Sequence, residues 1–401
     1  MQTEIEELVA RAARRGHDAL VVGVLTDGEA TFRGRGRGRD GRPADEATLF
    51  EIGSITKPFT GVLLADMFLR GEVRLDDPVS RYLPDAQVPR WKEREPTLEE
   101  LATHRASLPN APGGLVRKEL AFVLGLRSSD PWAALDAAAY REAVRRTAAR
   151  RPPGGRFRYS SLGFGLLGDA LAAHAGAPYE QLLQDRICSP LGLLDTAISI
   201  PPEKRARLVE GRSRRGHARP PLRDQMPGAG AIPASAHDLL RFLICYLAPR
   251  ADPPGPALRL ATEPRARVAK RIAIGLGWLI LRRPRKPVLI WHNGGTWGFR
   301  SFAAMVPDLR VGVVVLANTA CSSMPSRARV GGVSLHRRVC HPRAWSRQPS
   351  AGVFGSGAHA SSAHITMGRA TPFSPHPNAT ASDPLRCRGR MRAGLEARKA
   401  W

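Results

Sequence analysis

Residues 50–71 read FEIGSITKPFTGVLLADMFLRG, and this stretch decides both the fold and the chemistry. Apolar residues recur at close to helical spacing from Phe59 to Phe68, which predicts a helix that is buried over most of its circumference. We expect Ser54 at the N-cap and Gly71 just after the last turn. The sequence therefore places a short polar segment directly before a core helix.

Ser54 and Lys57 can act together at the start of this helix. Residues three apart share a helix face, so the hydroxyl and the amine can meet. The N-terminal end of a helix favours an oxyanion, and a buried lysine, whose pKa falls with lost hydration, can accept the hydroxyl proton. Alone, however, a Ser-x-x-Lys pair is weak evidence. Glu51 could simply pair with Lys57, and Ser54 could serve only as a cap.

The composition indicates a folded, strongly basic chain. It has 401 residues, of which 43% are hydrophobic, with a formal net charge of +25. Such a charge suggests a nucleic-acid partner. However, residues 321–401 hold thirteen Lys and Arg against two Asp and Glu, and the remaining excess is arginine scattered over loops without an aromatic-interleaved stripe. We therefore expect no nucleic-acid partner. A basic nucleic-acid-associated protein is kept as the third hypothesis, which a salt-sensitive gel shift tests.

No targeting, membrane or metal signal stands out. Residues 1–15 have no apolar core of a signal peptide, and no stretch approaches about 18 apolar residues. The five cysteines are odd in number and have neither metal nor disulfide spacing. We expect a cytoplasmic protein without a membrane segment, metal or cofactor, and leave the oligomeric state open.

The first hundred residues begin with a predicted helix and hairpin. Residues 4–15 have an amphipathic helical pattern, and residues 19–25 form an apolar strand that ends at Thr26-Asp27-Gly28. The return strand, 30–39, contains RGRGRG, which resembles an RNA-binding tract. Alternation with period two puts arginine on one strand face and glycine on the other, so we favour the hairpin.

Helical patterns then fill the middle of the chain, and strands return near its end. The expected helices are 98–102 capped by Thr97, 132–151, 162–175 and 236–247 capped by Ser235; the expected strands are 272–281, 288–292 and 311–317. Residues 200–227 are predicted loops. This order predicts an α+β fold with a sheet part at about 1–72 and 265–320 and a mainly helical part at about 73–264. A ligand is expected in the cleft between them.

Two further stretches carry chemistry. Residues 157–163 read FRYSSLG, where a phenol on a loop can relay a proton. Its alternative is an ordinary half-buried tyrosine beside a helix cap. Residues 291–299 read WHNGGTWGF, which ends a strand and opens a predicted glycine-rich turn. Glycines let a substrate lie along a strand edge and leave N–H groups free for an oxyanion. The alternative there is a tight hairpin with one histidine.

Together, the three stretches resemble the serine β-lactamase and penicillin-binding protein superfamily, and most closely its class C β-lactamase-like branch of D-alanyl-D-alanine carboxypeptidases and esterases. The superfamily signature is Ser-x-x-Lys, then Tyr-x-Asn, then Lys-x-Gly or His-x-Gly. It stands here as SITK at 54–57, YSS at 159–161 and HNG at 292–294. Supporting similarity includes LDDP at 75–78, LATH at 101–104, PLGL at 190–193 and GAG at 228–230. The resemblance covers residues 5–320.

The resemblance implies a β-lactamase/transpeptidase-like fold, an antiparallel sheet flanked by helices with a large helical insertion. It implies hydrolysis of a small-molecule ester, amide or peptide-like substrate through an acyl-enzyme. The implied site comprises Ser54 as nucleophile, Lys57 as its base, Tyr159 as the second proton relay, His292 holding Tyr159 or a substrate carboxylate, the N–H groups of Ser54 and Gly295 as oxyanion hole, and Ser161, Asn293 and Gly294 as substrate contacts.

Two departures from the signature modify this expectation. Ser161 replaces the usual asparagine and is too short to reach a substrate amide directly, which favours esters over amides and β-lactams. His292 replaces lysine, and histidine titrates near neutrality, so we predict pH-dependent activity between about 5 and 8. The second hypothesis is a catalytically silent relative that binds peptidoglycan-like or acyl ligands.

Residues 321–401 do not resemble the terminal helix of the family. Their basic, Ser-, Pro- and His-rich composition predicts a disordered tail. One hypothesis is a reading-frame slip near residue 321 that replaced the terminal helix with this sequence. The alternative is a basic tail that tethers the protein to an acidic surface.

Overall fold

The computed structural model describes residues 6, 9–10, 18–83, 88–113, 115, 118, 121–122, 131–132, 136–222, 226–248 and 251–320, and the backbone of 327–330 and 333–336. Residues 6, 9 and 10 are helical, as expected for residues 4–15. The rest of that helix and nearly all of the predicted tail lie outside the described residues.

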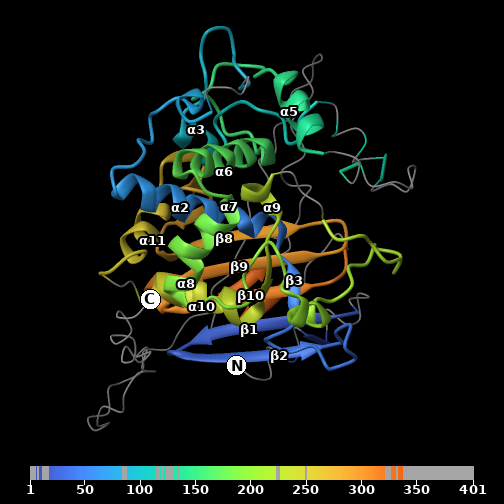
Figure 1. Cartoon of the computed structure of the whole chain (residues 1–401). Helices are drawn as coiled ribbons and strands as arrows, with labels where there is room; N and C mark the ends of the chain where they lie inside the picture. The colour runs from blue at the N-terminus through green and yellow to red at the C-terminus, as the bar shows by residue number, and fades with distance from the viewer. Residues whose placement is uncertain are drawn as a thin grey trace, which may run out of the picture. The chain divides into compact units, whose positions relative to one another are not determined.

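The main sheet has eight strands in the order β2-β1-β10-β9-β8-β7-β6-β5, and every neighbouring pair is antiparallel (Figure 1). The strands are β1 (Leu20–Thr26), β2 (Glu29–Arg35), β5 (Ala266–Ala269), β6 (Ile272–Ile274), β7 (Leu279–Arg283), β8 (Lys286–Gly295), β9 (Arg300–Val306) and β10 (Val311–Ala317). Pairing of Leu20 with Ala317 joins the two ends of the predicted sheet part, which confirms the α+β fold.

The Arg-Gly tract forms a strand only in part. Asp27 and Gly28 both have positive φ angles, 55° and 84°, as a tight hairpin turn requires. Strand β2 ends at Arg35, and Gly36 turns the chain with a φ of 87°. The expected strand is therefore correct to Arg35 and wrong for residues 36–39.

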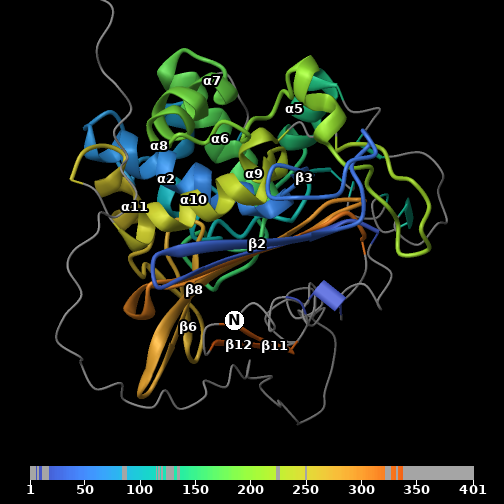
Figure 2. The same cartoon turned by 90° about the horizontal axis from the view of Figure 1, so that it is seen from below.

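Helices cover one face of the sheet in two layers. Figures 1 and 2 show α2, α10 and α11 next to the sheet, and Figure 1 shows α3, α5 and α6 farther out. The helices are α2 (Thr56–Leu69), α3 (Leu98–Ala102), α5 (Ala137–Arg145), α6 (Ser161–Ala175), α7 (Tyr179–Leu183), α8 (Ser189–Leu191), α9 (Pro227–Gly230), α10 (Ala236–Leu247) and α11 (Gly255–Ala261).

Shorter elements complete the described chain. Two small sheets pair β3 (Leu49–Glu51) with β4 (Pro233–Ser235), and β11 (Arg327–Val330) with β12 (Val333–His336). The 3₁₀ turns are η1 (Gly53–Ile55), η2 (Val79–Arg81), η4 (Pro202–Arg207) and η5 (Pro307–Leu309), and η3 (Gln184–Cys188) is a π-helical turn. None of the described helices is long and apolar enough to cross a membrane.

Helix α2 is the centre of the core. All its residues from Thr56 to Met67 are buried. The rings of Phe59 in α2 and Phe242 in α10 stack at 4.0 Å, and α10 in turn packs on β1, β9 and β10. Each such buried ring contributes roughly 1.5–3 kcal/mol. Helix α10 was expected to belong to the helical part, residues 73–264, but it packs directly on the sheet. Through its contact with Phe59 it also holds α2 over the sheet.

Local capping rules predict several boundaries correctly. Thr97 forms a capping box with Glu100, and Ser235 accepts a hydrogen bond from the Asp238 N–H at the start of α10. Helix α6 begins at Ser161, one residue before the prediction, and Gly176 ends it with a φ of 64°. Helix α5 is shorter than the expected 132–151.

Other expectations fail where distant contacts decide the conformation. The predicted strand 272–281 is two strands, β6 and β7, separated by a turn at Gly277 with a φ of 88°. A Cβ at Gly277 would lie 2.8 Å from the Lys57 carbonyl oxygen, so this turn packs against the start of α2. Ser54 is not an N-cap: α2 begins after Ile55, without a side-chain cap.

Candidate active site

Ser54 lies in η1, between β3 and α2. Gly53 before it has a φ of 51°, which a side chain would strain. A Cβ on Gly53 would also lie 2.7 Å from the backbone nitrogen of Gly295. The glycine thus lets the end of β8 approach the serine closely, and the Ser54 hydroxyl, relieved of a capping role, is available for other bonds.

Lys57 lies in the first turn of α2 and is fully buried. Its Nζ donates to Ser54 Oγ at 3.0 Å, to the Ala229 carbonyl oxygen at 2.7 Å and to Ser161 Oγ at 3.4 Å. These three acceptors hold Nζ in place beside Ser54 Oγ. Among the described residues Lys57 has no carboxylate partner, so the alternative pairing with Glu51 is wrong.

Tyr159 lies on the loop before α6 and completes a three-residue group. Its hydroxyl oxygen is 2.7 Å from Ser54 Oγ, across 105 residues of sequence. Lys57 Nζ lies 5.1 Å from the centre of the Tyr159 ring. Ser54 Oγ therefore accepts hydrogen bonds from an amine and a phenol, which is the arrangement of a nucleophile beside two groups that can exchange a proton with it.

His104 supports this loop, and sequence reasoning did not select it as a site residue. Its Nδ1 accepts from the Ser160 N–H at 3.1 Å, and its carbonyl oxygen accepts from the Arg158 N–H at 2.8 Å. Its ring lies 4.4 Å from that of Tyr159. Burial, then the charge of Lys57, lowers the pKa of His104 well below its usual value. A neutral ring thus holds the Tyr159 loop from behind; the LATH similarity was the available signal.

Ser161 and Asn110 form a further wall. The Ser161 N–H donates to Asn110 Oδ1 at 3.1 Å, and the Leu162 N–H donates to the Asn110 carbonyl oxygen at 3.0 Å. Ser161 Oγ faces Lys57, as its hydrogen bond shows. Asn110 was not predicted as a site residue, because nothing local in the sequence connects it to a serine 51 residues away.

Strand β8 brings the third motif to Ser54 through its backbone. Gly294 and Gly295 are the last residues of β8, paired with Ser301 and Arg300. The expected turn therefore begins later than predicted: Gly294 and Gly295 extend the strand, and the chain turns at residues 296–299, where the Thr296 N–H donates to the Phe299 carbonyl oxygen. A Cβ on Gly294 would lie 1.9 Å from the Ile52 carbonyl oxygen, which also accepts from Ser301 Oγ at 2.6 Å. Only a glycine fits this contact.

His292 is buried in β8, with 2% of its surface exposed. Its Nδ1 lies 2.7 Å from the Asn293 carbonyl oxygen, so Nδ1 carries the proton. Burial lowers the pKa of His292 to about 3, and the charge of Lys57 acts in the same direction. The expected titration near neutrality is therefore wrong. In the described structure His292 makes no hydrogen bond to Tyr159, and its binding of a substrate carboxylate stays a prediction.

Within the residues that the structure describes, no group of three or more His, Cys, Asp or Glu is arranged to hold a metal ion. The groups brought together are a hydroxyl, an amine, a phenol and backbone N–H donors at a strand end. That set is typical of acyl transfer through a serine.

The chain belongs to the Beta-lactamase family, whose model matches residues 2–332. It is accordingly a serine hydrolase of the serine β-lactamase and penicillin-binding protein superfamily. This confirms the resemblance inferred from the three motifs.

Individual relatives show how broad the similarity is. The chain is 31% identical over 321 residues to D-alanyl-D-alanine-carboxypeptidase/endopeptidase AmpH of Escherichia coli (strain K12), covering 75% of this chain and 79% of that protein. It is 28% identical to a Beta-lactamase of Escherichia coli (strain K12), covering 72% and 79%. The crystal structure of the class C beta lactamase from Rhodobacter sphaeroides superposes with a TM-score of 0.67 at 25% identity, covering 81% of this chain and 96% of that one. The fold is therefore class C β-lactamase-like.

Proposed function

We propose that the protein hydrolyses small acyl esters and D-alanyl peptide bonds through an acyl-enzyme on Ser54, and that it turns over β-lactams poorly. The observation that carries the proposal is the placement of Ser54 Oγ 3.0 Å from Lys57 Nζ and 2.7 Å from the Tyr159 hydroxyl. Both groups can exchange a proton with the serine without a further movement of the chain.

In the acylation step, Ser54 Oγ forms a bond to the carbonyl carbon of the substrate. Its proton passes to Lys57 or Tyr159, and Tyr159 returns a proton to the departing alcohol or amine as the old bond breaks. The backbone N–H groups of Ser54 and Gly295 stabilise the negative oxygen. Water then attacks the acyl-enzyme, the same groups move its proton, and Ser54 is regenerated.

His292 contributes to this scheme as a neutral group. With the Nδ1 proton engaged by the Asn293 carbonyl oxygen, only Nε2 remains, and it can accept a hydrogen bond. We therefore assign His292 to accept an N–H or O–H of the substrate, and Asn293 and Gly294 to line the same strand edge. A neutral acceptor suits an uncharged ester or amide better than a carboxylate.

The substrate preference rests on Ser161 and on the relatives. The E. coli relative is named for D-alanyl-D-alanine peptides, which supports peptides of this class as substrates. Ser161 Oγ is directed at Lys57 at 3.4 Å, which leaves a shorter side chain where the superfamily signature has asparagine. An amide substrate loses a hydrogen bond by this change, whereas an ester depends on it less. We expect esters to be cleaved fastest, then D-alanyl peptides, then β-lactams.

The first test is intact-protein mass after exposure to a fluorophosphonate and, separately, to a penicillin. We expect one fluorophosphonate adduct on the wild type, none on Ser54→Ala, and a slow penicillin adduct. Both proteins are checked by circular dichroism and thermal melting. A folded wild type with no adduct from either reagent, and no hydrolysis of a p-nitrophenyl ester, would instead support the silent ligand-binding alternative, which the comparisons do not favour.

Ser161→Asn tests the substrate preference. Restoring the longer amide side chain should raise the ratio of peptide to ester kcat/KM by roughly tenfold, the value of one hydrogen bond of about 1 kcal/mol or a little more. Ser161→Ala is the matched control, because it also removes the hydroxyl near Lys57 but adds no amide. An equal change of the ratio in both variants would show that the asparagine side chain is not what sets the preference.

A further inference from the structure

A cavity separate from the catalytic group lies where the loop before Tyr159 meets the α3 region. It measures about 1170 Å³ and is lined by the segment 150–158 together with Arg94, Glu100, Arg105 and Ser107. None of Ser54, Lys57 or Tyr159 lines it. We call it the arginine pocket, because six of its lining residues are Arg94, Arg105, Arg150, Arg151, Arg156 and Arg158.

The charges of the arginine pocket are poorly compensated by the protein. Its one lining carboxylate, Glu100, is already paired with Arg94 at 2.7 Å. The Arg105 guanidinium is bonded to the carbonyl oxygens of Gly154 and Gly155. The other four arginines make no side-chain hydrogen bond or ion pair within the described part of the chain.

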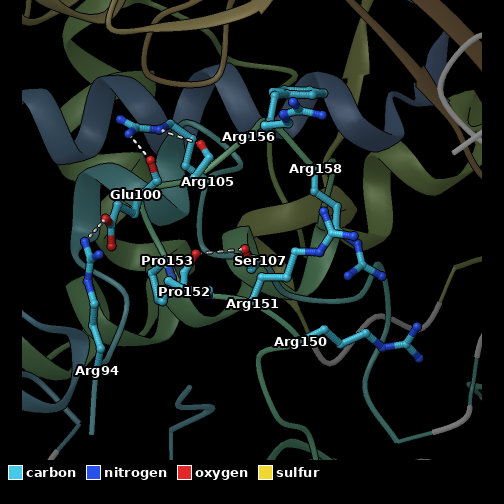
Figure 3. Close-up of a pocket in the computed structure, with 13 residues that line it drawn as sticks. Arg94, Glu100, Arg105, Ser107, Arg150, Arg151, Pro152, Pro153, Arg156 and Arg158 are labelled. Atoms are coloured by element: carbon cyan, nitrogen blue, oxygen red, sulfur yellow. Dashed lines mark hydrogen bonds and ion pairs between the residues drawn. The ribbon is translucent and has the colours of Figure 1, made fainter. Parts of the chain in front are cut away.

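Three of these free arginines crowd one another. Figure 3 shows Arg150, Arg151 and Arg158 on one side of the pocket, away from the Arg94–Glu100 pair. Partial burial, and then the charges of Arg150 and Arg151, lower the pKa of the Arg158 guanidinium. Like charges held this close repel one another, so a bound anion between them would remove an unfavourable interaction.

The pocket wall is fixed by hydrogen bonds. The Gly154 N–H donates to the Arg105 carbonyl oxygen at 3.0 Å, and Ser107 Oγ donates to the Pro152 carbonyl oxygen at 3.2 Å. Gly154 has a φ of 82°, and a Cβ there would lie 2.6 Å from Glu100 Oε1. Gly154 thus lets the loop pack closely against α3. The arginines of this loop therefore extend from a backbone that hydrogen bonds fix in place.

We propose that the arginine pocket binds a soluble polyvalent phosphate. Guanidinium groups bind phosphate oxygens with two parallel hydrogen bonds, and a phosphate group can carry two negative charges. One or two phosphate groups can therefore neutralise several arginines, whereas the same neutralisation needs a larger number of single carboxylates. A nucleic acid is not favoured, because the one aromatic side chain in the lining, Phe157, already packs edge-on against His104 with ring centres 5.4 Å apart.

The test uses inorganic tripolyphosphate with the full-length protein in isothermal titration calorimetry at 150 mM salt. The variant is Arg150→Gln/Arg151→Gln, which removes two free arginines and touches no group of the catalytic site. The matched control is Arg214→Gln/Arg215→Gln, an exposed adjacent pair outside the pocket with the same change of net charge. Labelling of Ser54 by a fluorophosphonate checks that each variant is folded. This check does not depend on phosphate binding in the arginine pocket.

We expect a single class of site on the wild type, at least about tenfold weaker binding by the pocket variant, and binding by the control within about twofold. Affinity should fall as salt is raised. Equal weakening in both variants, or no binding at millimolar tripolyphosphate, overturns the proposal. A parallel arm measures co-sedimentation with phosphatidylglycerol vesicles. Vesicle binding that depends on Arg150 and Arg151, with no tripolyphosphate binding, also overturns it and assigns the pocket to a lipid headgroup.

Discussion

The two sides of the candidate active site are held in different ways. On the helix side, Ser54, Lys57 and Tyr159 meet through side-chain hydrogen bonds. On the strand side, β8 packs against the backbone just before the serine: a Cβ on Gly294 would lie 1.9 Å from the Ile52 carbonyl oxygen, and a Cβ on Gly53 would lie 2.7 Å from the Gly295 nitrogen. Removing a side chain from the first deletes a chemical group, whereas adding a methyl group to the second displaces the backbone. The two sides should therefore fail differently when mutated.

Lys57→Met should have the largest effect. Methionine keeps most of the buried volume but removes the proton acceptor, so we expect the acylation rate to fall roughly a thousandfold, within the range for positioned acid–base groups. Thermal stability should change little, because methionine fills most of the same fully buried volume. Stopped-flow acylation and thermal melting measure both. Lys286→Met, at an exposed lysine of β8, is the control. A rate within tenfold of the wild type would contradict the role of Lys57.

Gly294→Ala tests the strand side. The added Cβ would lie 1.9 Å from the Ile52 carbonyl oxygen, so β8 must move away from Ser54. We expect kcat/KM to fall about a hundredfold, as for the loss of one oxyanion donor, and the melting temperature to fall as well. Gly312→Ala in β10 is the matched control, because its Cβ finds only ordinary contacts at 3.5 Å or more. Equal activity in the two variants would show that close approach of β8 is not required.

This contrast also explains what the sequence could predict. Ser54, Lys57 and Tyr159 could be selected because three short motifs, in the right order, resemble the signature of the superfamily. The periodic strands β1 and β10 and the capped helices α3 and α10 were equally accessible. Strand β9 was missed because its centre, Ala303–Ala304, has low strand propensity.

Features set by distant contacts were not accessible. The 3₁₀ turn that takes Ser54 out of the N-cap exists because Gly53 lies against Gly295. The burial of His292, which lowers its pKa to about 3, depends on the neighbouring strands of the sheet. The arginine pocket forms because the loop 150–158 folds back onto Arg105, about fifty positions earlier in the chain.

His104 offers a smaller test, confined to the helix side. His104→Ala leaves the Ser160 N–H without its acceptor and removes the ring beside Tyr159. We expect kcat to fall about tenfold, from an unsatisfied buried donor worth roughly 1–3 kcal/mol, with little change in KM. His104→Asn should recover part of the loss, because its oxygen can replace Nδ1 and asparagine tolerates the φ of 57° at this position. Equal rates for both variants would mean that the hydrogen bond to Ser160 does not position Tyr159.

The smallest expected effect concerns pH. His292 has its pKa lowered to about 3, so it stays neutral from pH 5 to 8. The ratio of kcat/KM between the wild type and His292→Asn should therefore stay constant within about twofold over that range, whatever the groups on the helix side contribute. A ratio that changes about tenfold per pH unit would restore the titration expected from the sequence alone.

The stability of the fold should depend on pH through His104 and His292. The pKa values of His104 and His292 are lower in the folded chain than the usual value near 6.5, so the unfolded chain binds more protons below that pH. Their contribution to stability is complete above about pH 6.5 and is lost as the pH falls toward the folded-state values. Thermal melting between pH 7.5 and 4.5 should show a falling midpoint, with a shallower fall in His292→Asn. If the melting midpoint falls equally in the wild type and in His292→Asn, the loss of stability at acid pH arises from groups other than His292.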